Sequence, residues 1–208
     1  MPAEPRVVPR FAAEPPHEPL PYGRWAERLR EEFLAACLAI DAQGEDVGEP
    51  GDISWHPDRT WHGHTYLPAT ATTSTGLELF GHVRFRTPEP GREPEELLAS
   101  ADFTSETAAE HPEWSLDLCD EVIGTWVGER SATAAITLVW GRALRGGGAI
   151  VTAELADLVV DQCPLQEGRF TLIAPDDYRG DFLDVKLFSE RGEELAAESL
   201  YEDDADED

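Results

Sequence analysis

The chain has almost no lysine, few cysteines and no long apolar run. Its 208 residues include 43 acids against 16 lysines and arginines, and Lys186 is the only lysine, so the formal charge is −27. No basic stripe is available to follow a phosphate backbone, and the acidic field repels one, which disfavours nucleic-acid binding. No apolar stretch approaches the roughly twenty residues of a membrane-spanning helix. We therefore expect neither nucleic acid nor a membrane as partner.

The number and spacing of the cysteines indicate in which cellular compartment the protein is expected. The three cysteines, Cys37, Cys119 and Cys163, are widely spaced and form no Cys-x-x-Cys pair. Such a pattern signals neither a disulfide framework nor a zinc ribbon. It predicts reduced, mostly buried thiols in a cytoplasmic protein. The N-terminal residues also lack the basic and apolar segments of a signal peptide, in agreement with a cytoplasmic location.

The two ends of the chain differ in composition from the middle. Residues 1–22 contain seven of the sixteen prolines. Proline fixes φ and removes a backbone donor, so a flexible, extended arm is predicted there. Residues 202–208 are acidic except for one alanine, and a block of like charges predicts a disordered tail. Residues 23–201 are long enough to form a single domain with its own core.

The beginning of this domain has a helical period and then changes to a period of two. Apolar residues recur at steps of three and four, which predicts an amphipathic helix packed on a sheet; they are Trp25, Leu29, Phe33, Ala36, Cys37 and Ile40. In residues 76–86, apolar and polar residues alternate, which predicts a half-buried strand. Its inward side chains would be Leu77, Leu79, Val83 and Phe85.

The remaining segments decide the fold class. Residues 88–113 are rich in Pro, Glu and Ala and predict one or two short helices. Five strand-like segments separated by turns follow between residues 120 and 188. Residues 193–201 fit a strand or a helix equally well. The prediction is an α+β fold, dominated by one antiparallel β-meander sheet that can curl into a partial barrel, with the N-terminal helix packed on it.

Residues 54–66, SWHPDRTWHGHTY, hold three of the six histidines and are the most distinctive stretch. In an extended chain Ile53, Trp55 and Trp61 would face one way, and the polar residues would face the other; these are His56, Asp58, Thr60, His62 and His64. Pro57-Asp58 predicts a turn that interrupts the stretch, which favours two short strands over one long strand. His62 and His64 would then lie roughly 6–7 Å apart at Cα. Neutral imidazoles at that spacing suit Zn or Fe.

A third metal ligand depends on the hairpin that follows. With a three-residue loop at 73–75, His82 lies diagonal to His64 on the same face. A two-residue loop moves His82 to the opposite face, because a one-residue slip inverts every side chain. Asp58 is a further candidate once a turn places it. Two neighbouring arginines weaken the metal hypothesis, because cations repel a bound cation.

Two tryptophans suggest a different kind of site. Trp126 and Trp140 lie in adjacent predicted strands. Side chains of this size usually fill the core. In a curled sheet they could instead form the walls of a pocket for a small apolar ligand, because such pockets are mostly apolar with a few polar groups.

The sequence contains no clear catalytic signature. It lacks the Gly-x-Ser-x-Gly turn of a serine nucleophile, and its carboxylates are too abundant for any pair to be singled out. The leading hypothesis is a non-enzymatic, acidic, intracellular binding or adaptor protein that neutralises a basic protein partner, since complementary charge speeds association. Two alternatives stay open: a metal-dependent hydrolase or oxygenase that uses His62 and His64, and a carrier of a small apolar ligand.

Overall fold

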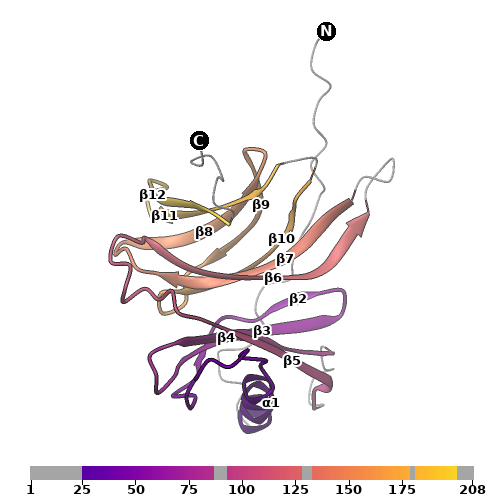
Figure 1. The fold of residues 1–208 in the computed structure, drawn as a ribbon. Helices are drawn as coiled ribbons and strands as arrows, with labels where there is room; N and C mark the ends of the chain where they lie inside the picture. Colours follow the sequence, from indigo (N-terminus) through magenta and orange to yellow (C-terminus); the bar gives the residue numbers. More distant parts are fainter. Residues whose placement is uncertain (1–24, 87–92, 128–132, 179–180, 201–208) are drawn as a thin grey trace, which may run out of the picture.

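The computed structural model describes residues 25–86, 93–127, 133–178 and 181–200 (Figure 1). The proline-rich arm predicted at 1–22 and the acidic tail predicted at 202–208 lie outside these residues. The helix α1 spans Ala26–Leu38. The strands are β1 (Ser54–Trp55), β2 (Arg59–Trp61), β3 (His64–Thr72), β4 (Glu78–Arg86), β5 (Glu95–Thr104), β6 (Leu116–Val127), β7 (Thr133–Ala143), β8 (Gly148–Leu155), β9 (Leu158–Pro164), β10 (Arg169–Asp176), β11 (Leu183–Ser189) and β12 (Glu194–Ser199).

The strands form three antiparallel sheets. The first sheet has the order β1-β3-β4-β5, with β2 also paired to β3; the second is β10-β7-β6, and the third is β12-β11-β8-β9. In Figure 1 the helix, the first, the second and the third sheet lie one above another. The antiparallel α+β class is therefore confirmed. The prediction of one sheet is wrong, and the described strands form no closed barrel.

The predicted apolar faces of the helix and of β4 meet in one cluster. Leu29, Phe33 and Cys37 of α1 are buried together with Leu79 and Val83 of β4 and with neighbouring residues of β3. The apolar face of β4 therefore packs against α1, which covers one face of the first sheet. No helix in the described residues is long and apolar enough to cross a membrane.

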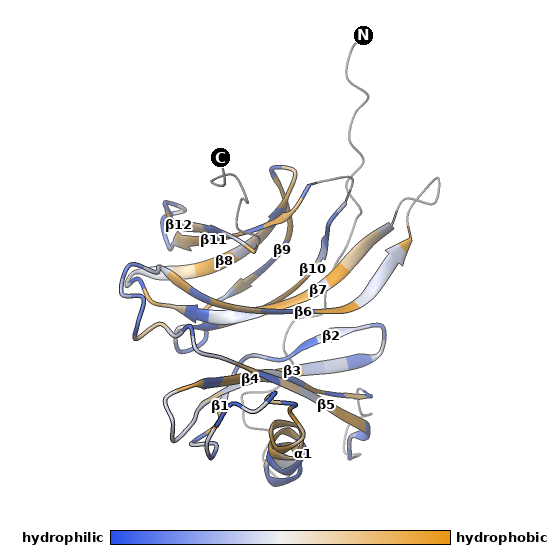
Figure 2. Ribbon diagram, in the orientation of Figure 1, coloured by the Kyte–Doolittle hydropathy of each residue, from blue (hydrophilic) through white to orange (hydrophobic). Residues whose placement is uncertain are grey.

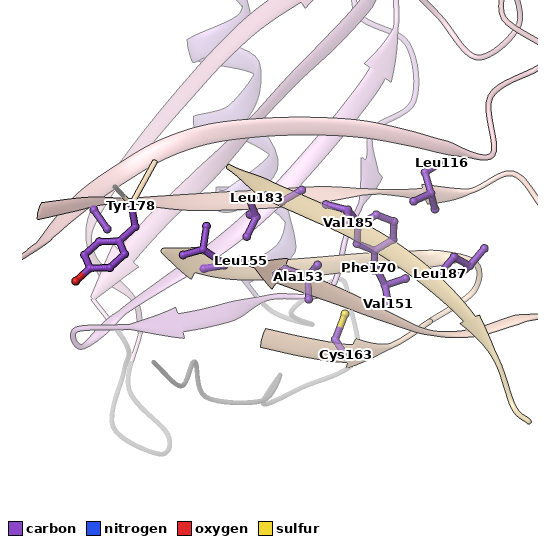
Figure 3. Close-up of a cluster of buried hydrophobic side chains, with 14 residues drawn as sticks. Leu116, Val151, Ala153, Leu155, Cys163, Phe170, Tyr178, Leu183, Val185 and Leu187 are labelled. Atoms are coloured by element: carbon purple, nitrogen blue, oxygen red, sulfur yellow. The ribbon is translucent and has the colours of Figure 1, made fainter. Parts of the chain in front are cut away.

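Two further clusters of buried apolar side chains lie between the sheets. The larger one joins the second and third sheets and consists of apolar residues such as Phe170, Val185 and Leu187 (Figure 3). The smaller one, around Trp140 and Ile173, lies between the first and second sheets. Figure 2 shows apolar segments along β7 and β8, whereas β2 and β3 are paler or more hydrophilic. Several buried polar side chains belong to the first sheet or to the segment between β1 and β2, among them His56, Arg59 and His82.

Residues 95–104 form a strand where a helix was predicted. The segment is rich in Glu, Leu and Ala, which favour helices. In the fold it is β5, which pairs with β4 from Glu78–Thr104 to Arg86–Glu95. Pairing satisfies the backbone groups along the edge of β4, and this gain exceeds the modest local helix preference. Residues 194–199, which fitted either structure, form the strand β12.

Candidate functional site

A pocket of about 160 Å³ opens between the first and second sheets. Five of its lining residues come from the first sheet: Tyr66, His82, Arg84, Leu98 and Ser100. Three come from β6 of the second sheet: Glu121, Val122 and Ile123. The pocket thus lies where two stacked layers meet, beside the strands β5 and β6, each of which is an edge of its sheet.

Strand register brings the residues of the first sheet together. Tyr66 pairs with Arg84, and Arg84 pairs with Leu98, so these three form one row across three strands. His82 pairs with Ser100 in the next row. Side chains two positions apart on a strand share a face, so all five project towards the second sheet. The other face of these strands packs on α1.

A hydrogen-bonded group of three side chains forms the floor of the site. The Nδ1 of His82 lies 2.9 Å from Oε2 of Glu121. The hydroxyl of Ser100 donates to the same oxygen at 2.6 Å, and it lies 3.4 Å from the His82 Nδ1. Burial alone would raise the pKa of Glu121, but the hydrogen bond and charge of His82 and the Ser100 hydroxyl outweigh burial and lower it. Glu121 is therefore a carboxylate at neutral pH.

The arrangement is not that of an activated serine. In a serine hydrolase the hydroxyl donates to the histidine, which acts as general base. Here the hydroxyl of Ser100 donates to Glu121, and the Nδ1 of His82 is directed at the same carboxylate oxygen. His82 and Ser100 together hold the Glu121 carboxylate in place. The Ser100 hydroxyl is therefore not positioned as the serine of such a triad.

The pocket is also lined by a tyrosine and an arginine, and the ring of Tyr66 lies 5.5 Å from that of His82. Burial raises the pKa of Tyr66 above its usual value, although the charge and hydrogen bond of Arg84 oppose the rise, so the phenol keeps its proton. The Nε of Arg84 is buried and has no hydrogen-bond partner among the described residues. Six other arginines in the described part of the chain form ion pairs with carboxylates. Arg84 forms none with a described carboxylate.

His62 and His64 do not form the predicted extended pair. His62 and Gly63 are the two central residues of a hairpin turn, with φ of 50° and 74°, and Trp61 pairs with His64 across it. The His64 Nδ1 lies 3.2 Å from the carbonyl oxygen of His62. The assumption of a continuous strand through residue 62 is therefore wrong, because the chain reverses there.

His82 and Asp58 also lie apart from His64. The β3–β4 loop has five residues, since Thr72 pairs with Glu78, and neither of the two predicted loop lengths is correct. His82 pairs with Pro68, four positions from His64 on the same face, which is roughly 13 Å along the strand. No group of three or more His, Cys, Asp or Glu in the described residues could hold a metal ion. Binding of Zn or Fe stays a prediction, without a shared site for these residues.

The two tryptophans repeated in the histidine stretch face different layers. Trp55 belongs to the cluster under α1, and its ring lies 5.9 Å from that of Phe33. Trp61 belongs to the cluster between the first and second sheets, where its ring covers Gly124 so closely that an added Cβ would lie 2.6 Å away. An uninterrupted extended chain would place both on one side. The structure instead has two short strands, β1 and β2, separated at Pro57-Asp58, as the sequence favours.

Trp126 and Trp140 do not line the pocket. Trp140 is fully buried, with its ring centroid 6.5 Å from that of Phe80. Trp126 packs edge-on against Tyr178 at 6.0 Å. Both side chains therefore fill space between sheets and do not form the walls of this pocket.

Two more polar groups are buried between the layers. The Nη2 of Arg59 in β2 donates to both carboxylate oxygens of Asp161 in β9, at 2.5 and 2.6 Å, and this ion pair joins the first sheet to the third. His56 is also buried, although the sequence alternation placed it on a polar face with Asp58. The pKa of His56 is lowered to about 3. Burial is the largest cause and the charges of Arg169 and Arg142 add to it, whereas the backbone carbonyls of Gly141 and Phe170 oppose the shift.

No protein-family model, curated protein or solved structure matches the chain. The sequence already placed His82 and Arg84 on one face of a strand. Tyr66 and Ser100 could have been added from the correct strand pairings. Glu121 could not, because it belongs to another sheet, and nothing local in its sequence indicates which layer it will meet.

Proposed function

We propose that the protein is a non-enzymatic binding protein whose pocket between the first and second sheets holds a small polar ligand. The observation that carries this proposal is that Arg84 and Glu121 line one pocket without forming an ion pair with each other. Opposite charges in a partly buried site normally pair, since each is costly to leave uncompensated. Arg84 forms no ion pair with a described carboxylate, and Glu121 has no described partner at Oε1 although His82 and Ser100 bind its Oε2, so both charges can meet a small ligand.

The size of the pocket limits the ligand. Its volume is about 160 Å³, and a cavity of roughly 150 Å³ holds benzene. Pockets for drug-sized molecules are larger, at about 300–1,000 Å³. A nucleotide or a fatty acid is therefore too large to be enclosed. The ligand is expected to be a molecule of about the size of a small amino or carboxylic acid.

Two observations favour binding over catalysis. The Ser100 hydroxyl is bonded to Glu121 and is not activated by His82. The cysteines Cys37 and Cys163 are buried, and burial raises the pKa of both to about 11, which makes them poor nucleophiles. The proposal keeps the non-enzymatic, cytoplasmic binding role that the sequence favours. It changes the expected small ligand from apolar to polar.

A tryptophan at the mouth of the pocket should abolish ligand binding. Val122 lines the pocket and is 58 % exposed, so Val122→Trp should cover the opening without disturbing the core. We expect affinity for a small ligand to fall at least about tenfold, equivalent to about 1.4 kcal/mol. The ligand would be found by NMR saturation transfer with a panel of small carboxylic acids, amines and amino acids.

The matched control is Val127→Trp. Val127 lies on the same strand, is 66 % exposed and does not line the pocket. The Val127→Trp variant should therefore bind the small ligand with the affinity of the wild type. Equal loss in both variants, or no loss in Val122→Trp, would place the ligand elsewhere. Conversion of the bound ligand during long incubation would instead show that the protein is an enzyme.

A basic protein partner remains a second candidate, and the edges of two sheets favour it. β5 and β6 each have one neighbour only, so one row of backbone donors and acceptors is unpaired within the described strands. Exposed side chains along them are apolar, as in Leu98 and Val122, or acidic, as in Asp102 and Asp120. Lysine, which commonly blocks such edges, is absent from both strands. An extended basic segment could add to either strand.

Charge reversal on these strands tests the basic-partner proposal. Asp102→Lys with Asp120→Lys should weaken low-salt capture of a basic partner from native lysate at least about tenfold, because complementary charge speeds association. Glu190→Lys with Glu193→Lys, at the turn of the third sheet, is the matched control and should retain capture. Capture that is insensitive to salt and equal in both double variants would argue against this surface.

A further inference from the structure

We infer that the pocket recognises a small zwitterion, a molecule of about the size of alanine that carries one carboxylate and one ammonium group. The carboxylate binds at Arg84 and Tyr66, and the ammonium binds at Glu121. This inference rests on the proposed binding function of the pocket and specifies its ligand class.

The Arg84 end of the pocket suits a carboxylate. A guanidinium is charged at every physiological pH and presents several donors in one plane, which matches the two oxygens of a carboxylate. Most other described arginines already have such a partner, for example Arg86 with Glu96 at 2.6 Å and Arg142 with Asp117 at 2.5 Å. Arg84 instead faces the pocket, beside the protonated hydroxyl of Tyr66. Together they can donate to both oxygens of a ligand carboxylate.

The Glu121 end suits an ammonium group. Among the described residues, both hydrogen bonds to this carboxylate end on Oε2, from His82 and from Ser100. The Oε1 atom is therefore available as an acceptor, and the side chain is 37 % exposed towards the opening. The two existing donors hold the carboxylate in place, so less conformational freedom is lost when a ligand binds.

The lining between these ends explains why the ligand is small. Leu98, Val122 and Ile123 contribute apolar surface beside the two charges. A short aliphatic side chain of an amino acid can contact them, and with a volume of about 160 Å³ there is little room for more.

A ligand with a single charge is a poorer match. A simple carboxylate would pair with Arg84 and gain no contact with Oε1 of Glu121, which would keep only His82 and Ser100 as partners; a simple amine would contact Glu121 and leave Arg84 without a counter-charge. An uncompensated charge at a partly buried site costs free energy. A zwitterion satisfies both groups, and its own opposite charges are aligned with them.

Three probes of nearly equal size separate these possibilities. L-Alanine, propionate and ethylamine would each be titrated into the full chain by calorimetry or NMR. Alanine should bind at least about tenfold more tightly than either of the others, because only alanine makes charge-assisted hydrogen bonds to both Arg84 and Glu121. Glycine, β-alanine and valine extend the series and report the permitted length and width.

Charge-neutralising variants then assign the two ends. Arg84→Gln should weaken alanine binding at least about tenfold and leave ethylamine binding unchanged, whereas Glu121→Gln should weaken alanine binding and leave propionate binding unchanged or improved. The matched controls are Arg86→Gln and Asp120→Asn, which remove like charges from adjacent positions outside the pocket. Thermal melting verifies that each variant is folded, and Arg84→Lys, which keeps the charge, should recover part of the affinity.

The outcomes distinguish the ligand class from the function. Equal binding of alanine and propionate, or alanine affinity within about twofold of wild type in both neutralised variants, would overturn the zwitterion. If another small molecule binds and Val122→Trp abolishes that binding, the proposed pocket function holds while the zwitterion is wrong. If no amino acid in the series binds, the zwitterion is likewise wrong.

Discussion

Asp161→Ala is expected to lower the free energy of unfolding by about 3–5 kcal/mol, because it leaves a buried arginine without its counter-charge. The side chains of Arg59 and Asp161 are only 4 % and 8 % exposed. Asp161 also accepts the backbone N–H of Ile173 at 2.9 Å and that of Gln162 at 2.8 Å. One substitution thus removes the contact between β2 and β9 and an acceptor for β10. Urea denaturation measures the change.

An exposed ion pair provides the control for this prediction. Arg86 and Glu96 are also in close contact, but their side chains are 59 % and 54 % exposed. Glu96→Ala should therefore cost less than about 1 kcal/mol. The double variant Arg59→Met with Asp161→Ala should be more stable than Asp161→Ala alone, because it removes the unpaired charge. If Asp161→Ala lowers the free energy of unfolding no more than Glu96→Ala does, the buried ion pair does not stabilise the fold more than an exposed one.

The apolar faces of α1 and β4 could be predicted because each is set by a local period. Leu29, Phe33 and Cys37 lie on one stripe of a helix, and Val83 and Phe85 lie on one face of a strand. Whichever surface covers such a face, its apolar residues become buried. This part of the prediction therefore did not depend on knowing the tertiary arrangement.

The polar faces could not be assigned in the same way. His56 and Asp58 were expected on the side turned away from the core, and both are almost fully buried. In a sheet with solvent on one side, alternation separates inside from outside. Here the first sheet has a helix on one face and a second sheet on the other, so both faces are covered. Alternation alone does not reveal how many layers are stacked.

Turn chemistry explains why the histidine prediction failed. His62 adopts a positive φ of 50°, which is uncommon for a residue other than glycine but is more frequent for His than for most others. The following Gly63 supplies the second positive φ of a two-residue hairpin turn. A His-Gly dipeptide between two strand-like segments was therefore a usable signal for this reversal.

The deeply buried His56 should make the fold sensitive to acid. Its pKa is about 3, against an ordinary value of 6.5. Between these two values the unfolded chain binds a proton that the folded chain excludes, so stability falls as the pH drops below 6.5 and is fully retained above it. At pH 5 this loss is about 2 kcal/mol, from 1.5 pH units at about 1.36 kcal/mol each. It continues to grow down to the folded pKa.

Removal of the imidazole isolates this contribution. His56→Leu should be less sensitive to acid than the wild type, with its free energy of unfolding falling by about 2 kcal/mol less between pH 7 and pH 5. His111→Gln, at a part-exposed histidine that bonds Glu113, should keep the wild-type slope. The NMR signal of the His56 ring, which should not titrate between pH 7.5 and 4.5, provides a measurement on the unmodified chain. A ring that titrates near 6.5, or equal slopes in wild type and His56→Leu, would mean that the arginines and the buried position do not exclude the proton.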